Sequence, residues 1–174
     1  MGTRFTATTA LRVPKNLITA HKTKLPIGLE FEVRLEGIHA IPIGPPLMLV
    51  HNECMIGYCE AFKVRQSLVK TKKTTVRARV INQKTAVALA RQEHHYVHNY
   101  IGWPPRDERT KTTLQEGQQF SFTKDGARHY PIGNPIQVAI GDDFQIVASC
   151  VLSHATISAL ETSVRGKILV VYDE

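Results

Sequence analysis

Strict alternation of apolar and polar residues predicts a β-strand over residues 29–35. In this LEFEVRL segment the apolar side chains share one face, and the charged side chains share the other. The segments 74–81 (TTVRARVI) and 164–172 (VRGKILVVY) alternate in the same way. The pattern therefore predicts short strands, each with one buried face and one face toward water.

A ten-residue stretch recurs along the chain and indicates an internal repeat. GIHAIPIGPP at 37–46 matches GARHYPIGNP at 126–135 at five positions. Placing residues 25–50 over 114–139 without gaps gives 8 identities in 26, where roughly one or two would arise by chance from ordinary composition. We therefore expect two copies of one β unit.

Glycine and proline indicate where the strands of each copy turn or end. A Glu-Gly pair at 36–37 and an Asp-Gly pair at 125–126 follow alternating segments, and we expect a hairpin to reverse at each. Pro42 and Pro131 lack the backbone N–H that a sheet ladder needs, so they mark strand ends or edges. Further apolar runs follow in each copy. Four to five short strands per copy predict a small barrel or sandwich.

Between the copies the period changes from that of a strand to that of a helix. Residues 83–103 follow a plausible N-cap, Asn82, and two prolines at 104–105 end the segment. A polar linker follows at 106–112. The apolar stripe expected on this helix runs through Ala86, Ala90, His94, Val97 and Ile101.

These patterns together predict an all-β, mainly antiparallel fold. We expect two duplicated small β-barrel or sandwich lobes with one linking α-helix. Each copy has near 60 residues, which is marginal for independent folding, so the lobes should share a core. The expected segments are an extended basic arm at 1–24, the first lobe at 25–82, the linking helix and linker at 83–113, and the second lobe at 114–174.

The net charge of +7 is placed unevenly along the chain. Residues 1–113 hold 18 Lys and Arg against 8 Asp and Glu, while residues 114–174 hold 4 against 7. No acid lies between Glu60 and Glu93. Such asymmetry points to a partner for the basic half, although a solvated charged face is the commoner reason for a charge run. The candidate binding patch is Lys63, Arg65, Lys70, Lys72, Lys73, Arg77 and Arg79.

The basic run could follow the phosphates of a nucleic acid. Alternation places Arg77 and Arg79 on one face of a strand, about 6–7 Å apart. Small barrels bind single strands with a basic groove and aromatic platforms. Here the candidates for exposed stacking are Tyr96, Tyr100 and Trp103.

Assembly with itself or with another protein is the rival interpretation. The acidic half of one molecule can meet the basic half of the next, and such head-to-tail contacts build rings or filaments. The arm at 1–24 holds five basic residues and no acid, as expected of a segment that orders on a neighbour, although a frayed tail has the same composition.

Residues that could support metal or thiol chemistry form no convincing set. His94 and His98 are four apart on the predicted helix, a spacing that lets two imidazoles bind one metal, but the sequence is not a His-Glu-x-x-His motif. Packing of His94 on the stripe, with His95 and His98 near the helix C-terminus where positive charge suits the dipole, is the favoured explanation. The three cysteines, an odd number, predict reduced and mostly buried thiols. We therefore expect no bound metal and no cofactor.

The sequence favours a non-enzymatic structural or binding protein that acts through protein–protein assembly, of the adaptor, scaffold or capsid-associated type. Single-strand or general nucleic-acid binding through residues 63–91 is the alternative, and a metal-dependent enzyme comes third. No apolar run is long enough to span a membrane, and the first residues lack the apolar core of a signal peptide. We therefore expect a cytoplasmic or virion-associated protein.

Overall fold

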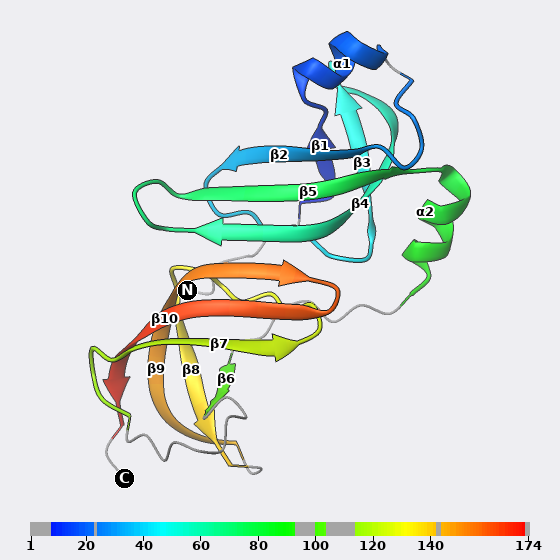
Figure 1. Ribbon diagram of the computed structural model, residues 1–174. Coiled ribbons are helices and arrows are strands. Elements are labelled where there is room, and N and C mark those ends of the chain that lie inside the picture. The colour runs from blue at the N-terminus through cyan, green and yellow to red at the C-terminus, as the bar shows by residue number, and fades with distance from the viewer. Residues whose placement is uncertain (1–7, 23, 93–99, 104–113, 142–143, 173–174) are drawn as a thin grey trace.

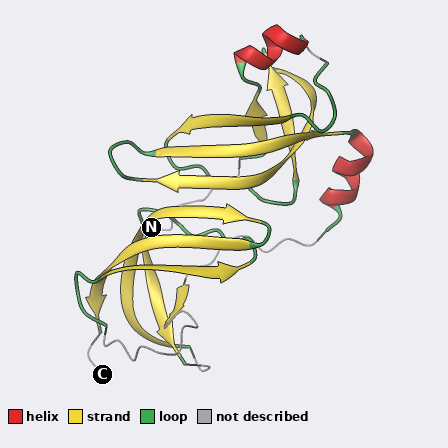
Figure 2. Ribbon diagram, viewed as in Figure 1, coloured by secondary structure: helices red, strands yellow, loops and turns green. Residues whose placement is uncertain are grey.

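The computed structural model describes residues 8–22, 24–92, 100–103, 114–141 and 144–172. Within these ranges the chain forms ten strands and two short helices (Figure 1; Figure 2). The first half contains β1 (Ala10–Arg12), α1 (Lys15–His21), β2 (Glu30–Glu36), β3 (Pro46–His51), β4 (Cys54–Ser67), β5 (Lys73–Ile81) and α2 (Gln83–Ala90). The second half contains β6 (Tyr100–Trp103), β7 (Gln119–Asp125), β8 (Pro135–Ile140), β9 (Gln145–Ser158) and β10 (Glu161–Val171).

All ten strands belong to one sheet. Its longest path runs β1-β3-β4-β9-β10-β7; β2 and β5 branch from β4, and β6 and β8 branch from β9. The pairs β1–β3 and β6–β8 are parallel, and the other seven are antiparallel. The prediction of a mainly β, mainly antiparallel fold is confirmed. The described strands do not close into a ring, so the expected barrel is not confirmed.

The same order of pairing occurs in β1–β5 and in β6–β10. In each set the first strand pairs with the third, the third with the fourth, the fourth with the fifth, and the fifth with the second. A buried threonine bonds alike in both halves: Thr74 Oγ1 donates to Gly37 O at 3.0 Å, and Thr162 Oγ1 donates to Gly126 O at 2.8 Å. The halves therefore join their strands in the same order and with similar side-chain contacts.

The two halves meet where β4 pairs with β9. The register of this pairing is symmetric: Lys63 lies opposite Ser158, Arg65 opposite Thr156, and Ser67 opposite His154. In Figure 1, β2, β5, β4, β9, β10 and β7 run side by side across the molecule, and the shorter strands cross them steeply. One continuous antiparallel surface thus spans both halves.

A single apolar core extends under both halves. Alternate residues of β5, among them Val76 and Ala78, are buried, and so are Val164 and Ile168 of β10. These residues belong to one cluster with residues of β3, β4, β8 and β9. The expected period-two burial is observed over 74–80 and 164–168, whereas Val170 and Tyr172 are exposed, so it does not continue to residue 172. The shared core follows from the continuous sheet.

The turns after β2 and β7 are not hairpins, contrary to our expectation. β2 pairs with β5 rather than with the next strand, and β7 pairs with β10. Gly37 and Gly126 both adopt positive φ, +85° and +77°, which suits glycine at a sharp change of direction. Gly37 N donates to Lys72 O, so the turn is held by the distant segment just before β5 rather than by the strand that follows it.

The linking helix is much shorter than the sequence predicted. Asn82 is the N-cap as expected, with its side chain accepting from Thr85 N at 2.8 Å, but α2 ends at Ala90. Residues 100–103 form β6, in which Ile101 and Trp103 are buried on one face. The helical prediction is wrong there because parallel pairing with β8 buries every second residue. The predicted positions His94 and Val97 lie outside the described residues.

Much of the predicted basic arm is part of the first half. β1 pairs with β3, and Leu11 is 1% exposed, while α1 follows at Lys15–His21. Leu11 and Val13 are buried, which explains why β1 joins the sheet. The described part of the segment is not extended throughout, because α1 follows β1. Residues 1–7 and 23 lie outside the described residues.

Candidate anion-binding groove

The outer face of the long antiparallel surface carries the polar side chains of six strands. Alternation turns Val76 and Val164 inward, so their neighbours Arg77 and Arg165 face outward. The two arginines occupy matching positions, since β5 and β10 take the same place in the two halves. The surroundings of these two arginines differ, and this difference defines the candidate site.

In the first half the arginines have acidic and aromatic partners. Arg79 Nη2 and Nε donate to Glu30 Oε1 at 2.7 and 3.3 Å, and Arg77 Nη2 lies 3.7 Å from Glu30 Oε2. Glu60 Oε1 lies 3.8 Å from Arg79 Nη1. The guanidinium carbons of Arg77 and Arg79 lie 5.3 and 5.5 Å from the centre of the Phe62 ring. The hydrogen bond and the charge of Glu30 raise the pKa of Arg79. This part of the face is therefore largely neutralised and filled.

In the second half the matching partners are neutral or small. Gln119 lies opposite Lys167, as Glu30 lies opposite Arg79, and Val151 also lies opposite Lys167, as Glu60 lies opposite Arg79. β4 and β9 have a β-bulge at corresponding places. The bulged residue is Phe62 in β4 and Ser153 in β9. Among the described residues, Arg165 and Lys167 have no carboxylate within 4.0 Å. Because neither the acids nor the ring is present at these positions, space and positive charge remain.

Two adjoining hollows occupy this space, and we call them together the groove. The first has a volume of about 520 Å³ and the second about 730 Å³. They share Ser121, His154 and Arg165. Arg65 reaches the first hollow across the junction of the two halves, and Lys167 lines the second. The groove thus depends on residues from β4, β9, β10 and β7.

The lining of the groove suits an anion. It combines Arg65, Arg165 and Lys167 with hydroxyl donors, and no acidic residue occurs among the described residues that line it. Ser153 Oγ donates to Arg165 O at 3.3 Å and lies 3.0 Å from His154 Nδ1, so Ser153 fixes the imidazole beside Arg165. The hydroxyl groups in the lining are those of Ser121, Thr123, Ser153, Thr156 and Ser163.

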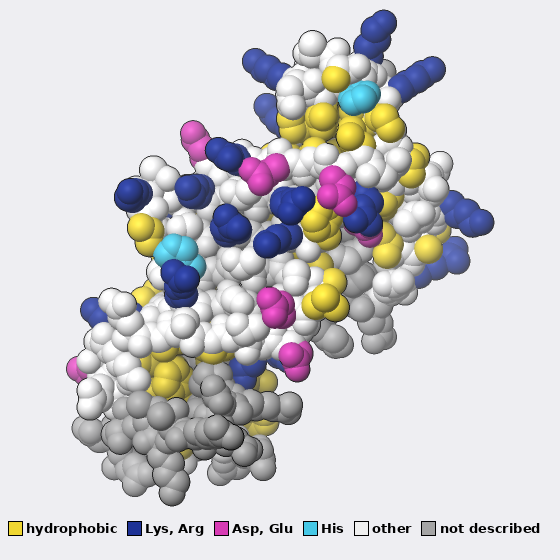
Figure 3. All heavy atoms as spheres, viewed as in Figure 1, with side chains coloured by type: hydrophobic (Ala, Val, Ile, Leu, Met, Phe, Trp, Pro, Cys, Tyr) yellow, Lys and Arg dark blue, Asp and Glu magenta, His cyan; other side chains and the backbone are white. Residues whose placement is uncertain are grey.

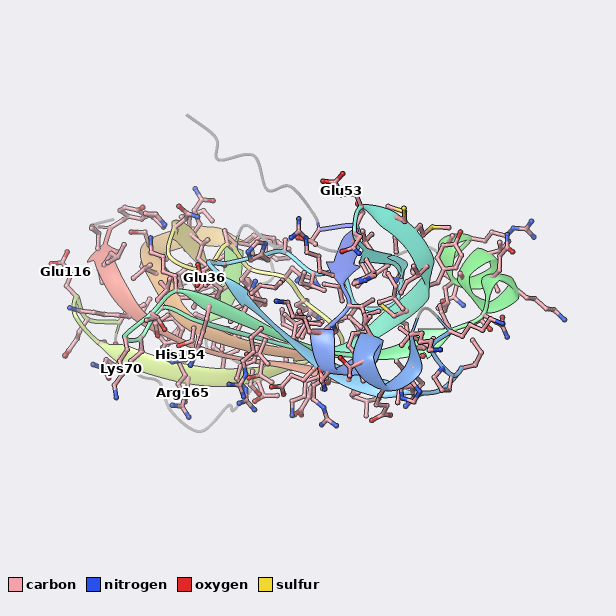
Figure 4. All side chains as sticks on the ribbon, turned by 90° about the horizontal axis from the view of Figure 1, so that it is seen from above. Glu36, Glu53, Lys70, Glu116, His154 and Arg165 are labelled. Carbon is pink, nitrogen blue, oxygen red and sulfur yellow. The ribbon has the colours of Figure 1, made fainter. Side chains whose placement is uncertain are left out.

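The space-filling view shows Lys and Arg side chains, with a His among them, gathered across the middle of one face (Figure 3). Seen from above, His154 and Arg165 lie on the same side of the sheet (Figure 4). Figure 4 also places Glu36 and Glu116 away from these two side chains. His154 and Arg165 of the groove therefore share one side of the sheet.

The predicted basic patch does not form one uniform surface. Lys63 and Arg65 lie on the outer face of β4, and Lys70, Lys72 and Lys73 lie in and beside the loop before β5. Arg77 and Arg79 are paired with Glu30, as described above. Of the predicted set, Arg65 is the residue that lines the groove.

The sequence analysis missed Arg165, Lys167 and His154 as site residues. Arg165 aligns with Arg77 in the repeat, so a signal was present, but the sequence of β10 does not reveal which residues face it from β7 and β9. The absence of an acid opposite Lys167 follows only from the register of three strands.

The predicted stacking residues do not form an exposed set. Trp103 is only 9% exposed and packs edge-on against Phe120, so it is not a free platform. Tyr100 is exposed but packs edge-on against Phe144. Tyr96 lies outside the described residues, as do His94 and His98, the candidate metal ligands.

The thiols are free, and two of them are buried as predicted. Burial raises the pKa of Cys59 and of Cys150 to about 12, with Glu60 adding to the effect at Cys59. Both therefore remain protonated at neutral pH, where a thiolate would be needed for nucleophilic attack or metal binding. Within the part of the chain that the structure describes, no group of three or more His, Cys, Asp or Glu side chains could hold a metal ion.

No helix in the described ranges is long and apolar enough to cross a membrane. In comparisons with known proteins, no family model, no curated protein and no solved structure matches this chain.

Proposed function

We propose that this chain is a non-enzymatic binding protein and that its groove holds a single-stranded nucleic acid by the phosphate backbone. One observation carries the proposal: Arg165 and Lys167 face an open hollow, whereas the matching Arg77 and Arg79 are covered by Glu30 and Phe62. Exposed cations without acidic partners attract anions, and guanidinium groups bind phosphate oxygens in pairs.

A strand of phosphates fits the shape of the groove better than a single anion does. Arg165 and Lys167 are two residues apart on β10, or about 7 Å. Arg65 lies on β4, two strands away from β10. It is opposite Thr156 of β9, whereas Arg165 is opposite His154, so Arg65 lies roughly 12 Å beyond Arg165. Cations spread over such a length favour a ligand with repeated negative charges. Serine and threonine hydroxyls between them supply further donors to phosphate oxygens.

The groove favours binding without strong sequence preference. Its lining has cations and hydroxyls, while Phe122 is buried and Phe120 is half-buried against Trp103. Base stacking on exposed rings usually supplies much of single-strand affinity, so a groove of this kind relies on charge. We therefore expect moderate affinity that depends steeply on salt concentration.

A salt titration with a fluorescent oligothymidylate tests the proposal. The three groove cations at phosphates predict a contribution of about −2 to the slope of log affinity against log salt. The variant R65Q/R165Q should bind at least about tenfold more weakly at low salt, and its slope should be less steep than that of the parent by about 1.4. The control K15Q/K24Q removes the same charge from exposed sites near α1 and should bind like the parent.

A second variant closes the groove with the residues of the other half. Q119E/S153F places the Glu and the Phe of the first half at the matching positions, a combination that this fold already accommodates. The variant should remain folded and lose binding. Equal affinity of both groove variants and the parent, at unchanged circular dichroism, would contradict the proposal.

We also propose that the two halves are copies of one ancestral unit. The matched order of pairing, the matched threonine bonds and the eight identities in 26 aligned residues support this. The unit would comprise β1–β5, so that it begins before residue 25. In this proposal one copy lost its acids and its ring, and the groove opened there.

Self-assembly is the second candidate, and one observation favours it. Within the described residues, β1, β2, β6 and β7 each pair with one neighbour, so each leaves one side of a strand open to pairing. The outward residues of β2, Glu30, Glu32, Arg34 and Glu36, are all charged, a feature that discourages pairing at an edge. Light scattering at low salt tests this candidate: a particle mass that rises with concentration would support it, and a constant 19.5 kDa would exclude it.

A further inference from the structure

The loops that join the last two strands of each half differ in length and charge. Between β4 and β5 lie five residues, 68–72, which we call the basic loop because it contains Lys70 and Lys72. Between β9 and β10 lie only Ala159 and Leu160, and neither is charged. Three extra residues and two cations therefore distinguish the first half at this place.

The basic loop belongs to the first half but is attached to the second, beside the groove. Leu68 N donates to Ser153 O at 2.9 Å. The Leu68 side chain packs against Gly133, where an added Cβ would lie 3.1 Å from Leu68 Cδ1. Val69 lines the larger hollow together with His154 and Arg165. The loop therefore forms one wall of the groove.

The two lysines of the loop are held outward. Lys70 has a positive φ of 65°, and Thr71 N donates to Val69 O at 2.8 Å, which closes a tight turn around it. Lys70 and Lys72 are exposed, and no carboxylate lies within 4.0 Å of either among the described residues. In Figure 4, Lys70 and Arg165 project from the same side of the sheet.

A third hollow, of about 570 Å³, lies between the basic loop and the end of β2. Lys72, Lys73 and Arg34 line it together with one acid, Glu36. Arg34 Nε is 3.2 Å from Glu32, so the lysines supply most of the charge that remains for a ligand. Positive hollows thus lie at both sides of the loop, one in each half of the molecule.

We propose that the ligand of the groove continues over the basic loop onto the first half, so that it is a polynucleotide strand rather than a nucleotide or a short fragment. This inference rests on the proposed function. A dinucleotide would contact only the groove, whereas a longer strand would also meet Lys70 and Lys72. The loop would therefore act on affinity only when the ligand is long enough to reach it.

The test compares a thymidine dinucleotide with a twelve-nucleotide oligothymidylate, using the parent, K70Q/K72Q and the charge-matched control K15Q/K24Q. K70Q/K72Q should bind the longer strand at least about fivefold more weakly, and its salt slope should be smaller by about 1.4, which is two phosphate contacts. Affinity for the dinucleotide should stay within about twofold of the parent.

The outcomes separate the two proposals. If K70Q/K72Q and K15Q/K24Q bind the longer strand equally, the loop takes no part and the inference is wrong, while the groove stands. Equal weakening of both ligands would also overturn it, because the loop would then act on the groove itself. If the parent binds neither ligand, the proposed function fails, and the inference fails with it.

Discussion

At the scale of single residues, neighbouring side chains in the core must have complementary sizes, and the two halves meet this need with different residues. In the first half Phe31 lies beside Ala78, which lies beside Ala61. In the second half Phe120 lies beside Gly166, which lies beside Leu152. The larger Leu152 leaves no room for a methyl group at the neighbouring position. Glycine at 166 is therefore required by packing rather than by backbone conformation.

Gly166→Ala should destabilise the protein by about 1–3 kcal/mol, because the added carbon would lie 2.7 Å from Leu152, Phe120 and the carbonyl of Val151. Urea unfolding followed by circular dichroism measures the change. Gly57→Ala is the control: its added carbon would meet only Leu49, at 3.9 Å, and it should be nearly neutral. Unchanged stability of the first variant would contradict the packing argument.

The double variant L152A/G166A reproduces the two alanines of the first half. It removes the leucine that meets the new methyl group, so its loss of stability should be smaller than the sum of the losses in G166A and in L152A. If the double variant is less stable than the sum of the single changes predicts, the two positions do not share volume in this way.

At the scale of elements, the sequence analysis did not predict β1 and β6, the two short strands that pair in parallel with β3 and β8. β1 and β6 have three and four residues, too few for alternation to stand out from a tail or a helix. Each is specified by its partner, β3 or β8, which lies far along the chain. The long alternating strands and the N-cap at Asn82 were predictable because their signals are local.

Leu11→Ala tests whether β1 is part of the fold. Leu11 is 1% exposed, so its truncation should cost about 2–5 kcal/mol in unfolding free energy. Arg12→Ala, on the exposed face of the same strand, should change stability by less than about 0.5 kcal/mol. If β1 were a loose arm, both substitutions would be neutral in thermal or urea unfolding.

At the scale of the whole molecule, the symmetric register at β4–β9 gives each strand of one half a counterpart in the other. The region of the first half that corresponds to the groove is filled by the Phe62 ring. There Glu30 neutralises the charge of Arg77 and Arg79. Among the described residues, the asymmetry of the two halves therefore opens the groove in the second half and fills its counterpart in the first.

Opening the counterpart should create a second site. In E30Q/F62S the guanidinium groups of Arg77 and Arg79 lose Glu30 and the Phe62 ring, while Glu60 stays 3.8 Å from Arg79. We expect the number of thymidine dinucleotides bound per chain to rise from one to two by isothermal titration calorimetry. E30Q alone, which keeps Phe62, should bind one or bind the second weakly. A folded double variant that still binds one would contradict the comparison of the halves.

The sequence by itself determined the β class, the inward and outward faces of much of the long strands and the start of α2, because these depend on neighbours within a few residues. It could also show that Arg77 and Arg165 match. Only the tertiary structure decided which of them is covered, since Glu30, Phe62, Gln119 and Ser153 reach the two arginines from other strands. Charge and space at a sheet surface are set across strands, and the chain order does not state which strands lie side by side.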